Sequence, residues 1–270
     1  MSSKGDFLSD IILLMIVATW NINSIKMRMK ILTSWLRKVE PDFLCLQETK
    51  VRDEEFPKEE LKRVGYNSVF SGEGGRNGVS ILSKDEPDFE SAGFLDGEED
   101  NEKRLISAKF RDLTIVSVYV PLGGSVGSER FKYKMRFFNR LRMYFNRFHK
   151  PDEKIILCGD FNVVLTDMDV YDEMDLIGEI GLLPEEREKL KEFLSWGFYD
   201  TFRYKNPDKK EFSFWDYRRN AFKKNKGMRI DYIFVTEPLI KVLIDSYIDV
   251  EPRELEKPSD HTPVVSIFKD

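Results

Sequence analysis

The sequence predicts an α/β protein built as a single domain. Short apolar runs with β-branched residues recur along the whole chain, segments of helical periodicity lie between them, and no low-complexity linker separates two halves. A chain of 270 residues exceeds the commonest domain size, but one large α/β domain of this length is common. With 41% apolar and 34% charged residues, the chain can bury a sizeable core beneath a well-solvated surface.

Nine short runs of β-branched and aliphatic residues, bounded by turn residues, predict strands. Several are continuously apolar rather than alternating, which is typical of strands covered on both faces. In chain order they are "MIVATWN", "PDFLCLQET", "YNSVFSG", "NGVSILS", "LISAKF", "LTIVSVYVP", "KIILCGDFN", "RIDYIFVT" and "TPVVSIF". Periodicity alone does not determine how many sheets these strands form.

Three segments between the strands predict amphipathic helices. The first, "KMRMKILTSWLRKVEP", stops at a proline and carries one apolar side made of Met29, Leu32, Trp35, Leu36 and Val39. The second, "PEEREKLKEFLSWGF", begins with a proline and two glutamates, as helix N-termini commonly do, and ends at a glycine. The third, residues 130–150, has many Lys and Arg facing solvent and a predicted core side made of Phe137, Leu141, Tyr144, Phe145 and Phe148.

The N-terminus and the cysteines predict an intracellular protein, cytoplasmic if the source is prokaryotic, with no membrane partner. The longest apolar run, residues 11–20, is about half the length needed to cross a bilayer, and no signal peptide precedes it. We predict a short extension over residues 1–14, with Met15 as an alternative start, followed by one domain over residues 15–270. Cys45 and Cys158 lie in strand-like runs, as buried thiols in a reducing compartment would.

Polar residues gather where the predicted strands end. Asp160 and Asn162 share one face of their strand, as do Asn21 and Asn23, because side chains two positions apart point the same way. Taken one pair at a time, such residues are more often turn caps. Several other strands, however, also end in polar groups: Gln47, Glu48, Thr49, Tyr119, Asp231, Asp260 and His261. Because functional groups collect at strand ends in α/β proteins, this pattern predicts a site.

Asp231 is the most informative member, because a carboxylate inside the apolar run "MRIDYIFV" requires a compensating partner. The chain has two histidines. His149 lies in a basic segment and is predicted to be solvated, which leaves His261 as the partner by elimination.

The ordered motifs resemble those of the exonuclease III type of apurinic/apyrimidinic endonuclease, within the endonuclease/exonuclease/phosphatase superfamily. The resemblance covers nearly the whole chain from about Met15. It rests on "WNIN", "LCLQETK", "GRNGVSILSK", "YVP", "GDFN", "FSFWDYRRNA", "RIDYI" and "SDHTPV" in this order. Each motif alone is weak, but "LQETK", "GDFN" and "SDH" together are highly specific.

The resemblance implies a four-layered two-sheet α/β sandwich of the deoxyribonuclease I type and metal-assisted hydrolysis of a phosphodiester. It implies Mg²⁺, with Mn²⁺ as a substitute, near Asn23, Glu48 and Asp260, in agreement with the preference of hard cations for oxygen ligands. Asp160 would orient and deprotonate the attacking water, and His261, oriented by Asp231, would stabilise phosphoryl oxygens. The remaining catalytic assignments are Asn21, Tyr119 and Asn162.

The resemblance also implies double-stranded DNA containing abasic sites as the partner of a monomeric enzyme. Predicted DNA contacts are Lys26, Arg76 and, in the basic run from residue 218 to residue 229, Arg218, Arg219, Lys223 and Lys224. Phe214, Met228 and Ile230 match the walls of an apolar pocket for the extruded abasic sugar. The chain departs from the family at Met228, where tryptophan is usual, and at Leu122, where asparagine is usual.

The predicted function is abasic-site cleavage in base-excision repair, 5′ to the lesion, leaving 3′-hydroxyl and 5′-deoxyribose phosphate ends. Associated 3′ to 5′ exonuclease or 3′ end-trimming activity is expected. The departures at Leu122 and Met228 keep open a related nuclease acting on uracil-containing or undamaged DNA or RNA. Two further classes are an inositol phosphatase, whose usual sequence context is absent, and a non-catalytic DNA-binding module, which would not need Glu48, Asp160 or His261.

Overall fold

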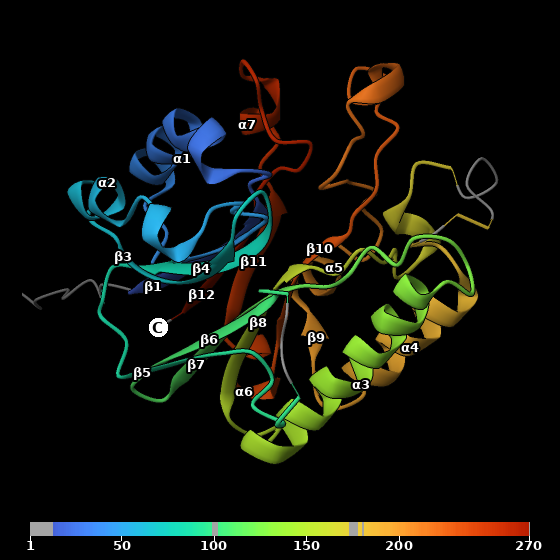
Figure 1. The fold of residues 1–270 in the computed structure, drawn as a ribbon, viewed down its shortest axis with the longest axis horizontal. Coiled ribbons are helices and arrows are strands. Elements are labelled where there is room, and N and C mark those ends of the chain that lie inside the picture. The colour runs from blue at the N-terminus through green and yellow to red at the C-terminus, as the bar shows by residue number, and fades with distance from the viewer. Residues whose placement is uncertain (1–12, 99–101, 173–177, 180, 270) are drawn as a thin grey trace, which may run out of the picture.

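Two six-stranded mixed sheets stack face to face in the computed structural model, which describes residues 13–98, 102–172, 178–179 and 181–269 (Figure 1). The first sheet contains, in spatial order, β11 (Leu243–Ile248), β12 (Val264–Lys269), β1 (Leu14–Asn21), β2 (Phe43–Gln47), β4 (Arg76–Ser83) and β3 (Asn67–Glu73). The second contains β5 (Phe89–Ala92), β6 (Leu105–Phe110), β7 (Leu113–Tyr119), β8 (Lys154–Asp160), β10 (Asp231–Val235) and β9 (Tyr199–Asp200).

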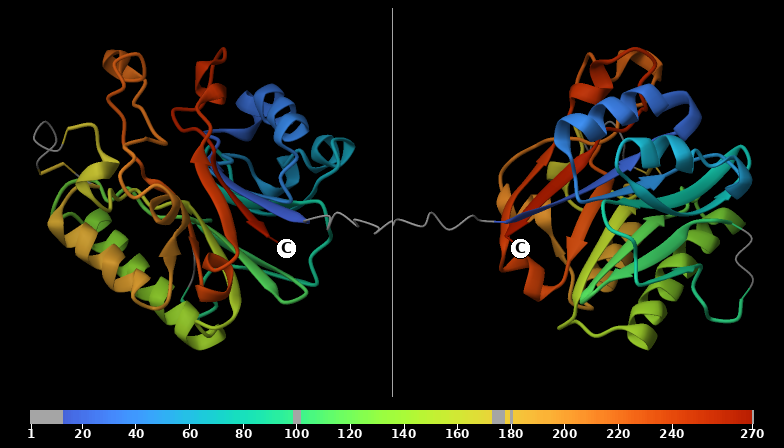
Figure 2. Two further views of the ribbon diagram at one scale, coloured as in Figure 1. Left: turned by 180° about the vertical axis from the view of Figure 1, so that it is seen from behind. Right: turned by 90° about the vertical axis from the view of Figure 1, so that its left-hand side faces the viewer.

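Helices cover the outer face of each sheet and complete four layers (Figures 1 and 2). α1 (Ile25–Val39) and α2 (Lys58–Arg63) lie on the first sheet, whereas α3 (Glu129–Phe148) and α4 (Pro184–Leu194) lie on the second. Shorter helices occupy connections: η1 (Asp53–Glu55), η2 (Asp167–Asp169), α5 (Thr201–Lys205), η4 (Arg218–Asn220), α6 (Glu237–Ile240) and α7 (Glu251–Glu254). The predicted four-layered single domain is thereby confirmed.

Three apolar cores follow from this layering. One fills the space between the sheets and contains Cys45 of β2 and Cys158 of β8, both buried and free. The second lies between the second sheet and the helices α3 and α4, and the third between the first sheet and α1. Strands buried on both faces need apolar residues at consecutive positions, which explains their continuous apolar runs.

Strand register brings the polar strand ends together. β1 and β2 are parallel, and Asn21 pairs with Gln47. β7 and β8 are also parallel, and Tyr119 pairs with Asp160. β10 runs antiparallel to β8 and starts with Asp231 opposite Asp160. The ends of strands from both sheets therefore meet at one edge of the sandwich.

All nine predicted strands form, but three others were missed. The missed strands β5, β9 and β11 are each at the edge of a sheet. β5 is largely exposed, β9 has only 2 residues, and β11 has exposed positions in its middle. An edge strand of this kind lacks the continuous apolar run that identifies a central strand.

Two residues near the end of α3 correct the sequence-based expectations. Phe148, predicted to face the core, is the last residue of α3 and is 40% exposed. His149, predicted to be solvated, has a side chain only 13% exposed and lies 3.0 Å from the carboxylate of Glu153.

Among the helices in the described part of the chain, none is long and apolar enough to cross a membrane.

Candidate active site

Asn21, the last residue of β1, joins the polar groups of the two sheets. Its side-chain nitrogen donates to Oε1 of Glu48 at 2.8 Å and to Oδ2 of Asp160 at 2.9 Å. Its side-chain oxygen accepts from the backbone amide of Asn23 at 3.1 Å. Asn21 is fully buried, so this amide holds two carboxylates from different sheets in a fixed relation.

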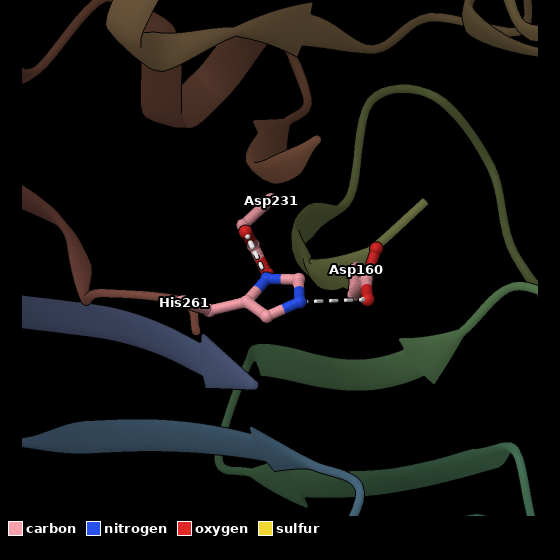
Figure 3. A group of neighbouring side chains, drawn as sticks. All are labelled: Asp160, Asp231 and His261. Atoms are coloured by element: carbon pink, nitrogen blue, oxygen red, sulfur yellow. Dashed lines mark hydrogen bonds and ion pairs between the residues drawn. The ribbon is translucent and has the colours of Figure 1, made fainter. Parts of the chain in front are cut away.

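Asp160, Asp231 and His261 form a buried group at the edge of the second sheet (Figure 3). Nδ1 of His261 lies 2.8 Å from Oδ2 of Asp231, and its Nε2 points toward Oδ2 of Asp160 at 3.8 Å. The pairing of Asp231 with His261, inferred by elimination from the sequence, is what the structure shows. Nδ1 is therefore held by one carboxylate while Nε2 faces the other.

Burial and charge act in opposite directions on this group. Burial alone lowers the pKa of His261, but the charge and hydrogen bond of Asp231 outweigh it and raise that pKa to about 10. Burial raises the pKa of Asp160 to about 7, although the charge of His261 opposes this rise. Between about pH 7 and pH 10, the site therefore holds a carboxylate next to an imidazolium.

Three oxygen-bearing side chains lie on the other side of Asn21: Asn23, Glu48 and Asp260. Asn23 donates from its side chain to Oδ1 of Asp260 at 2.8 Å. The ammonium of Lys50 lies 2.6 Å from Oδ1 of Asn23 and 2.7 Å from Oε2 of Glu48. Burial raises the pKa of Glu48, but hydrogen bonds from Asn21 and Lys50 lower it by a larger amount. The net shift of the pKa is therefore downward, and Glu48 is an anion.

The position of Lys50 tests whether this group fits a metal ion. Two of the predicted metal ligands already converge on one positive charge, and both offer oxygen atoms, which hard divalent cations prefer. The side chain of Glu48 is 18% exposed, so a cation can reach it from solvent. The donor set therefore fits a hard divalent cation that replaces the ammonium of Lys50.

The buried group of Asp160, Asp231 and His261 is a second arrangement with metal-ligating atoms, all within 4.8 Å of one another. Its histidine can ligate a metal only when neutral, since a protonated imidazole has no free lone pair. With a pKa raised to about 10, His261 is protonated at neutral pH. The group containing Glu48 is thus the better cation site.

Tyr119 and Asn162 complete the polar surface of the site. Burial and the nearby charge of Glu48 raise the pKa of Tyr119 well above its ordinary value, so the phenol keeps its proton and can donate it in a hydrogen bond. The backbone amide of Asn162 donates to Oδ1 of Asp160 at 2.9 Å. The side-chain amide of Asn162 gives one N–H to the carbonyl of Val120 at 2.9 Å and retains a second.

An apolar cluster adjoins His261. The predicted pocket residues Phe214, Met228 and Ile230 belong to it, together with Val164, Val170, Tyr171 and Leu182. Phe214 forms isolated β-bridges with both Met228 and His261, and its ring centroid lies 4.8 Å from that of the imidazole. The structure therefore places the predicted apolar wall in direct contact with the predicted catalytic histidine.

The predicted DNA-contacting cations differ in their surroundings. Arg219, Lys223 and Lys224 are exposed on a loop that projects beside α7 (orange in Figure 1). Three others are exposed but lie next to carboxylates: Lys26 with Glu55, Arg76 with Glu73, and Arg218 with Asp216.

Arg229 corrects the interpretation of residues 218–229 as a uniformly basic DNA-contacting run. It is fully buried, with ion pairs to Asp169 at 2.7 Å and Asp200 at 2.8 Å. Burial at the root of the loop requires such compensation. Arg229 therefore anchors the loop internally rather than presenting charge to a ligand.

Sequence reasoning missed two residues that support the site. Ser213 donates to Oδ2 of Asp231 at 2.6 Å and accepts the backbone amide of Asp231 at 3.1 Å. Its position in "FSFWDY", as a small polar residue between two aromatics, was the available signal. Lys50 was the second, and its presence in "LQETK" gave no hint that its ammonium would bridge Asn23 and Glu48.

A two-sheet α/β sandwich with carboxylates, an amide and an imidazole gathered at one end of the sheets defines a hydrolase of the deoxyribonuclease I type. The chain belongs to the Endonuclease/Exonuclease/phosphatase family, whose model matches residues 18–261. The family inferred from the motifs is therefore confirmed.

Individual relatives align over nearly the whole chain. It is 36% identical to exodeoxyribonuclease III of Haemophilus influenzae, over 93% of this chain and 98% of that protein. It superposes on an AP endonuclease from Archaeoglobus fulgidus with a TM-score of 0.92 and 39% identity, covering 95% of this chain and 100% of that one. The chain also superposes on the 3′ phosphatase NExo from Neisseria, solved with a product DNA hairpin. The TM-score is 0.90 and the identity 33%, over 94% of this chain and 99% of that one.

Proposed function

We propose that this protein cleaves double-stranded DNA on the 5′ side of abasic sites and leaves 3′-hydroxyl and 5′-deoxyribose phosphate ends. The broader class, a DNA-repair nuclease, agrees with the exodeoxyribonuclease III and AP endonuclease relatives. The observation that carries the proposal is the contact of the apolar cluster around Phe214 with His261. A base-free sugar fits a small apolar recess beside the catalytic groups, whereas a nucleotide that keeps its base is larger and more polar.

In the proposed mechanism, Glu48 would hold Mg²⁺, with Asn23 and Asp260 beside it, and Mn²⁺ would be a substitute. When bound, the cation supplies positive charge to the phosphoryl oxygens and to the leaving alkoxide. Asn21 fixes the position of Glu48 relative to Asp160, because its side-chain amide donates a hydrogen bond to each carboxylate. One buried amide nitrogen therefore orients both the carboxylate that would hold the cation and the carboxylate that would accept the proton.

Asp160 accepts the proton of the attacking water, at the carboxylate that the Asn21 side chain and the Asn162 backbone amide orient. A base with a pKa of about 7 suits proton transfer at neutral pH. The imidazolium of His261 and the phenol of Tyr119 donate hydrogen bonds to the phosphoryl oxygens as charge develops there. Asn162 retains one side-chain N–H for the same purpose or for the water.

DNA contacts are proposed for Lys26, Arg76, Arg218, Arg219, Lys223 and Lys224 on both sides of the site. Cations beside a phosphodiesterase site favour a polyanion. Arg219, Lys223 and Lys224 are exposed on the projecting loop and form no salt bridge with any carboxylate in the described part of the chain. We further propose that the enzyme works as a monomer inside the cell.

A second candidate function is trimming of DNA 3′ ends, alone or together with abasic-site cleavage. Leu122, in the position where the family usually has asparagine, is 58% exposed beside Tyr119 and offers no polar side chain to a phosphate. Met228 contributes a flexible side chain to the apolar cluster proposed to hold the sugar. The relative described as a 3′ phosphatase has this fold at a TM-score of 0.90.

The deciding experiment uses end-labelled duplex DNA with one tetrahydrofuran abasic analogue. Parallel reactions contain an intact duplex, a uracil duplex and a nicked duplex with a 3′-phosphate, each with Mg²⁺ or EDTA. A Mg²⁺-dependent cut immediately 5′ to the analogue, much faster than any other reaction, supports the proposal. Dominant removal of the 3′-phosphate supports the second candidate, and preference for the uracil or intact duplex contradicts both.

A further inference from the structure

A buried ion pair lies behind the site, between α3 and α4. The ammonium of Lys134 and Oε1 of Glu186 are 2.5 Å apart, and both side chains are fully buried. The two helices lie side by side on the outer face of the second sheet (Figure 1). Removing two charges from water is expensive, and in many proteins a buried ion pair can be replaced by apolar residues of similar volume without loss of stability. A role other than stability is therefore a reasonable expectation.

The pair uses its hydrogen-bonding capacity on the backbone around the site. The Lys134 ammonium donates to the carbonyl of Asn162 at 2.7 Å and to that of Leu122 at 3.3 Å, in addition to Glu186. An ammonium has three N–H groups, so all are occupied. Oε2 of Glu186 accepts the backbone amides of Gly181 at 2.6 Å and Leu183 at 3.2 Å.

These bonds connect two segments that carry catalytic groups. Leu122 follows Tyr119 after β7, and Asn162 follows Asp160 after β8. Asn162 has φ of 51°, a left-handed conformation that is uncommon for residues with a side chain, although asparagine tolerates it better than most. Its backbone amide, in turn, donates to Oδ1 of Asp160 at 2.9 Å. Lys134 is thus connected through a single residue, Asn162, to the carboxylate of Asp160, which is proposed to accept the proton of the water.

Gly181 shows how closely the segment held by Glu186 packs against Asn162. A Cβ atom at Gly181 would lie 3.1 Å from the carbonyl oxygen of Asn162, and the φ of this glycine is +92°. The carbonyl of Gly181 accepts the amide of Val164 at 2.7 Å. The carbonyl of Asn162, which accepts from Lys134, therefore packs against Gly181, whose backbone amide donates to Glu186.

We infer that Lys134, anchored by Glu186, is a positioning residue for phosphodiester cleavage: it holds Asn162 in its left-handed conformation and thereby orients the carboxylate of Asp160. This inference rests on the proposed function, since it concerns the same site. Lys134 is fully buried and all its N–H groups are bonded within the protein, so it acts through Asn162 and not on the substrate. Its loss is expected to impair the chemical step and to leave DNA binding in place.

The first test compares Lys134→Met, the neutral pair Lys134→Met/Glu186→Gln, and Lys134→Arg on the abasic duplex. We expect kcat to fall 10- to 100-fold in the first two variants, with KM and DNA Kd within about threefold, because Asn162 loses its donor in both. Lys134→Arg, which keeps the charge and N–H donors, should recover most of kcat. A neutral pair that folds stably and retains full kcat would overturn the inference.

Arg140→Met is the matched control. Arg140 also lies on α3 and forms an ion pair with Asp96, at 2.7 Å, but Asp96 is not part of the site. We expect this variant to change the Tm while kcat stays within twofold of the unaltered enzyme. An equal loss of kcat in Arg140→Met and Lys134→Met would reduce the effect to general destabilisation of α3 and contradict the inference.

The second test needs neither DNA nor cleavage, so it separates failure of this inference from failure of the proposed function. Amide hydrogen exchange is measured at Asn162, with Ile155 at the far end of β8 as an internal reference, because its amide bonds Thr236. We expect at least tenfold faster exchange at Asn162 in Lys134→Met, and a smaller increase in the milder Glu186→Gln if the first variant folds poorly. Unchanged exchange at Asn162 in the folded variants overturns the inference.

Discussion

Nε2 of His261 lies 3.8 Å from Oδ2 of Asp160, too far for a hydrogen bond but close enough for a strong interaction between charges. The two side chains are almost completely buried, so water screens them little. This separation leaves the carboxylate of Asp160 without a hydrogen bond to the imidazole of His261.

The first prediction concerns the pH dependence of cleavage. Asp160 must be deprotonated to act as a base, so activity should rise as pH increases through its pKa of about 7. A divalent cation bound at Glu48 would move this limb lower. His261 must be protonated to donate to the phosphate, so activity should fall as pH increases through about 10. Single-turnover rates between pH 5 and 11 check this, and a rate that keeps rising beyond pH 10.5 would rule out an imidazolium donor.

The second prediction concerns Asp231→Asn. Asp231 makes the largest contribution that raises the pKa of His261 against the effect of burial, so its removal should lower that pKa, although the charges of Asp160 and Asp260 still raise it. The alkaline limb should move to lower pH, and the maximal rate should fall by about 10²-fold. Ser213→Ala, which removes a donor to Asp231 but keeps the carboxylate, should cause a smaller change. An unmoved alkaline limb in Asp231→Asn would show that another group titrates there.

The third prediction concerns Asp160→Asn, which preserves shape but cannot accept a proton. Cleavage should slow by about 10²- to 10⁴-fold while DNA binding persists. Asp42→Asn is a suitable control, because Asp42 lies just before the start of β2, whereas the site lies at the end of that strand. Asp42 accepts a hydrogen bond from the backbone amide of Ile16. The control should lower the Tm and leave the rate unchanged. Cutting by Asp160→Asn at the unaltered rate would refute its assigned role.

The fourth prediction concerns cation binding without catalysis. In EDTA the protein should stay folded, because the ammonium of Lys50 already neutralises Glu48. Mg²⁺ should raise the Tm, with a gain of about 2.7 kcal/mol when its concentration is 100 times Kd. Glu48→Gln should abolish that rise, whereas Lys50→Met, which removes the competing charge, should lower the Kd for Mg²⁺. Thermal denaturation across a Mg²⁺ titration measures both, and an undiminished rise in Glu48→Gln would place the cation elsewhere.

The fifth prediction concerns the projecting basic loop. Replacing Arg219, Lys223 and Lys224 by glutamine should weaken binding to any duplex. Each lost phosphate contact should flatten the dependence of log K on log salt by about 0.9, or about 2.7 for three contacts. Arg218→Gln should have less effect, because Asp216 already pairs with that guanidinium. Fluorescence anisotropy at several salt concentrations tests this, and an unchanged slope in the triple variant would exclude the loop from the interface.

The sequence determined much of this protein by itself. Central strands covered on both faces must be apolar at consecutive positions, so eight of the nine predicted strands were visible as apolar runs in the sequence, whereas the ninth, β3, is an edge strand. The polar ends of those runs identified the site, because Asp160 and Asn21 break an otherwise apolar pattern. Burial inside "MRIDYIFV" likewise required a partner for Asp231, and only two histidines were available.

Only the tertiary structure decided the features that depend on groups distant in the chain. The edge strands β5, β9 and β11 have no two-sided burial and hence no apolar run. Arg229 looks like its basic neighbours in sequence, yet Asp169 and Asp200 enclose it. The pair of Lys134 and Glu186 resembles ordinary charges on two helices until α3 and α4 pack together. Burial and ion pairing depend on the groups around a side chain. For these side chains, those groups come together only when the layers of the sandwich assemble.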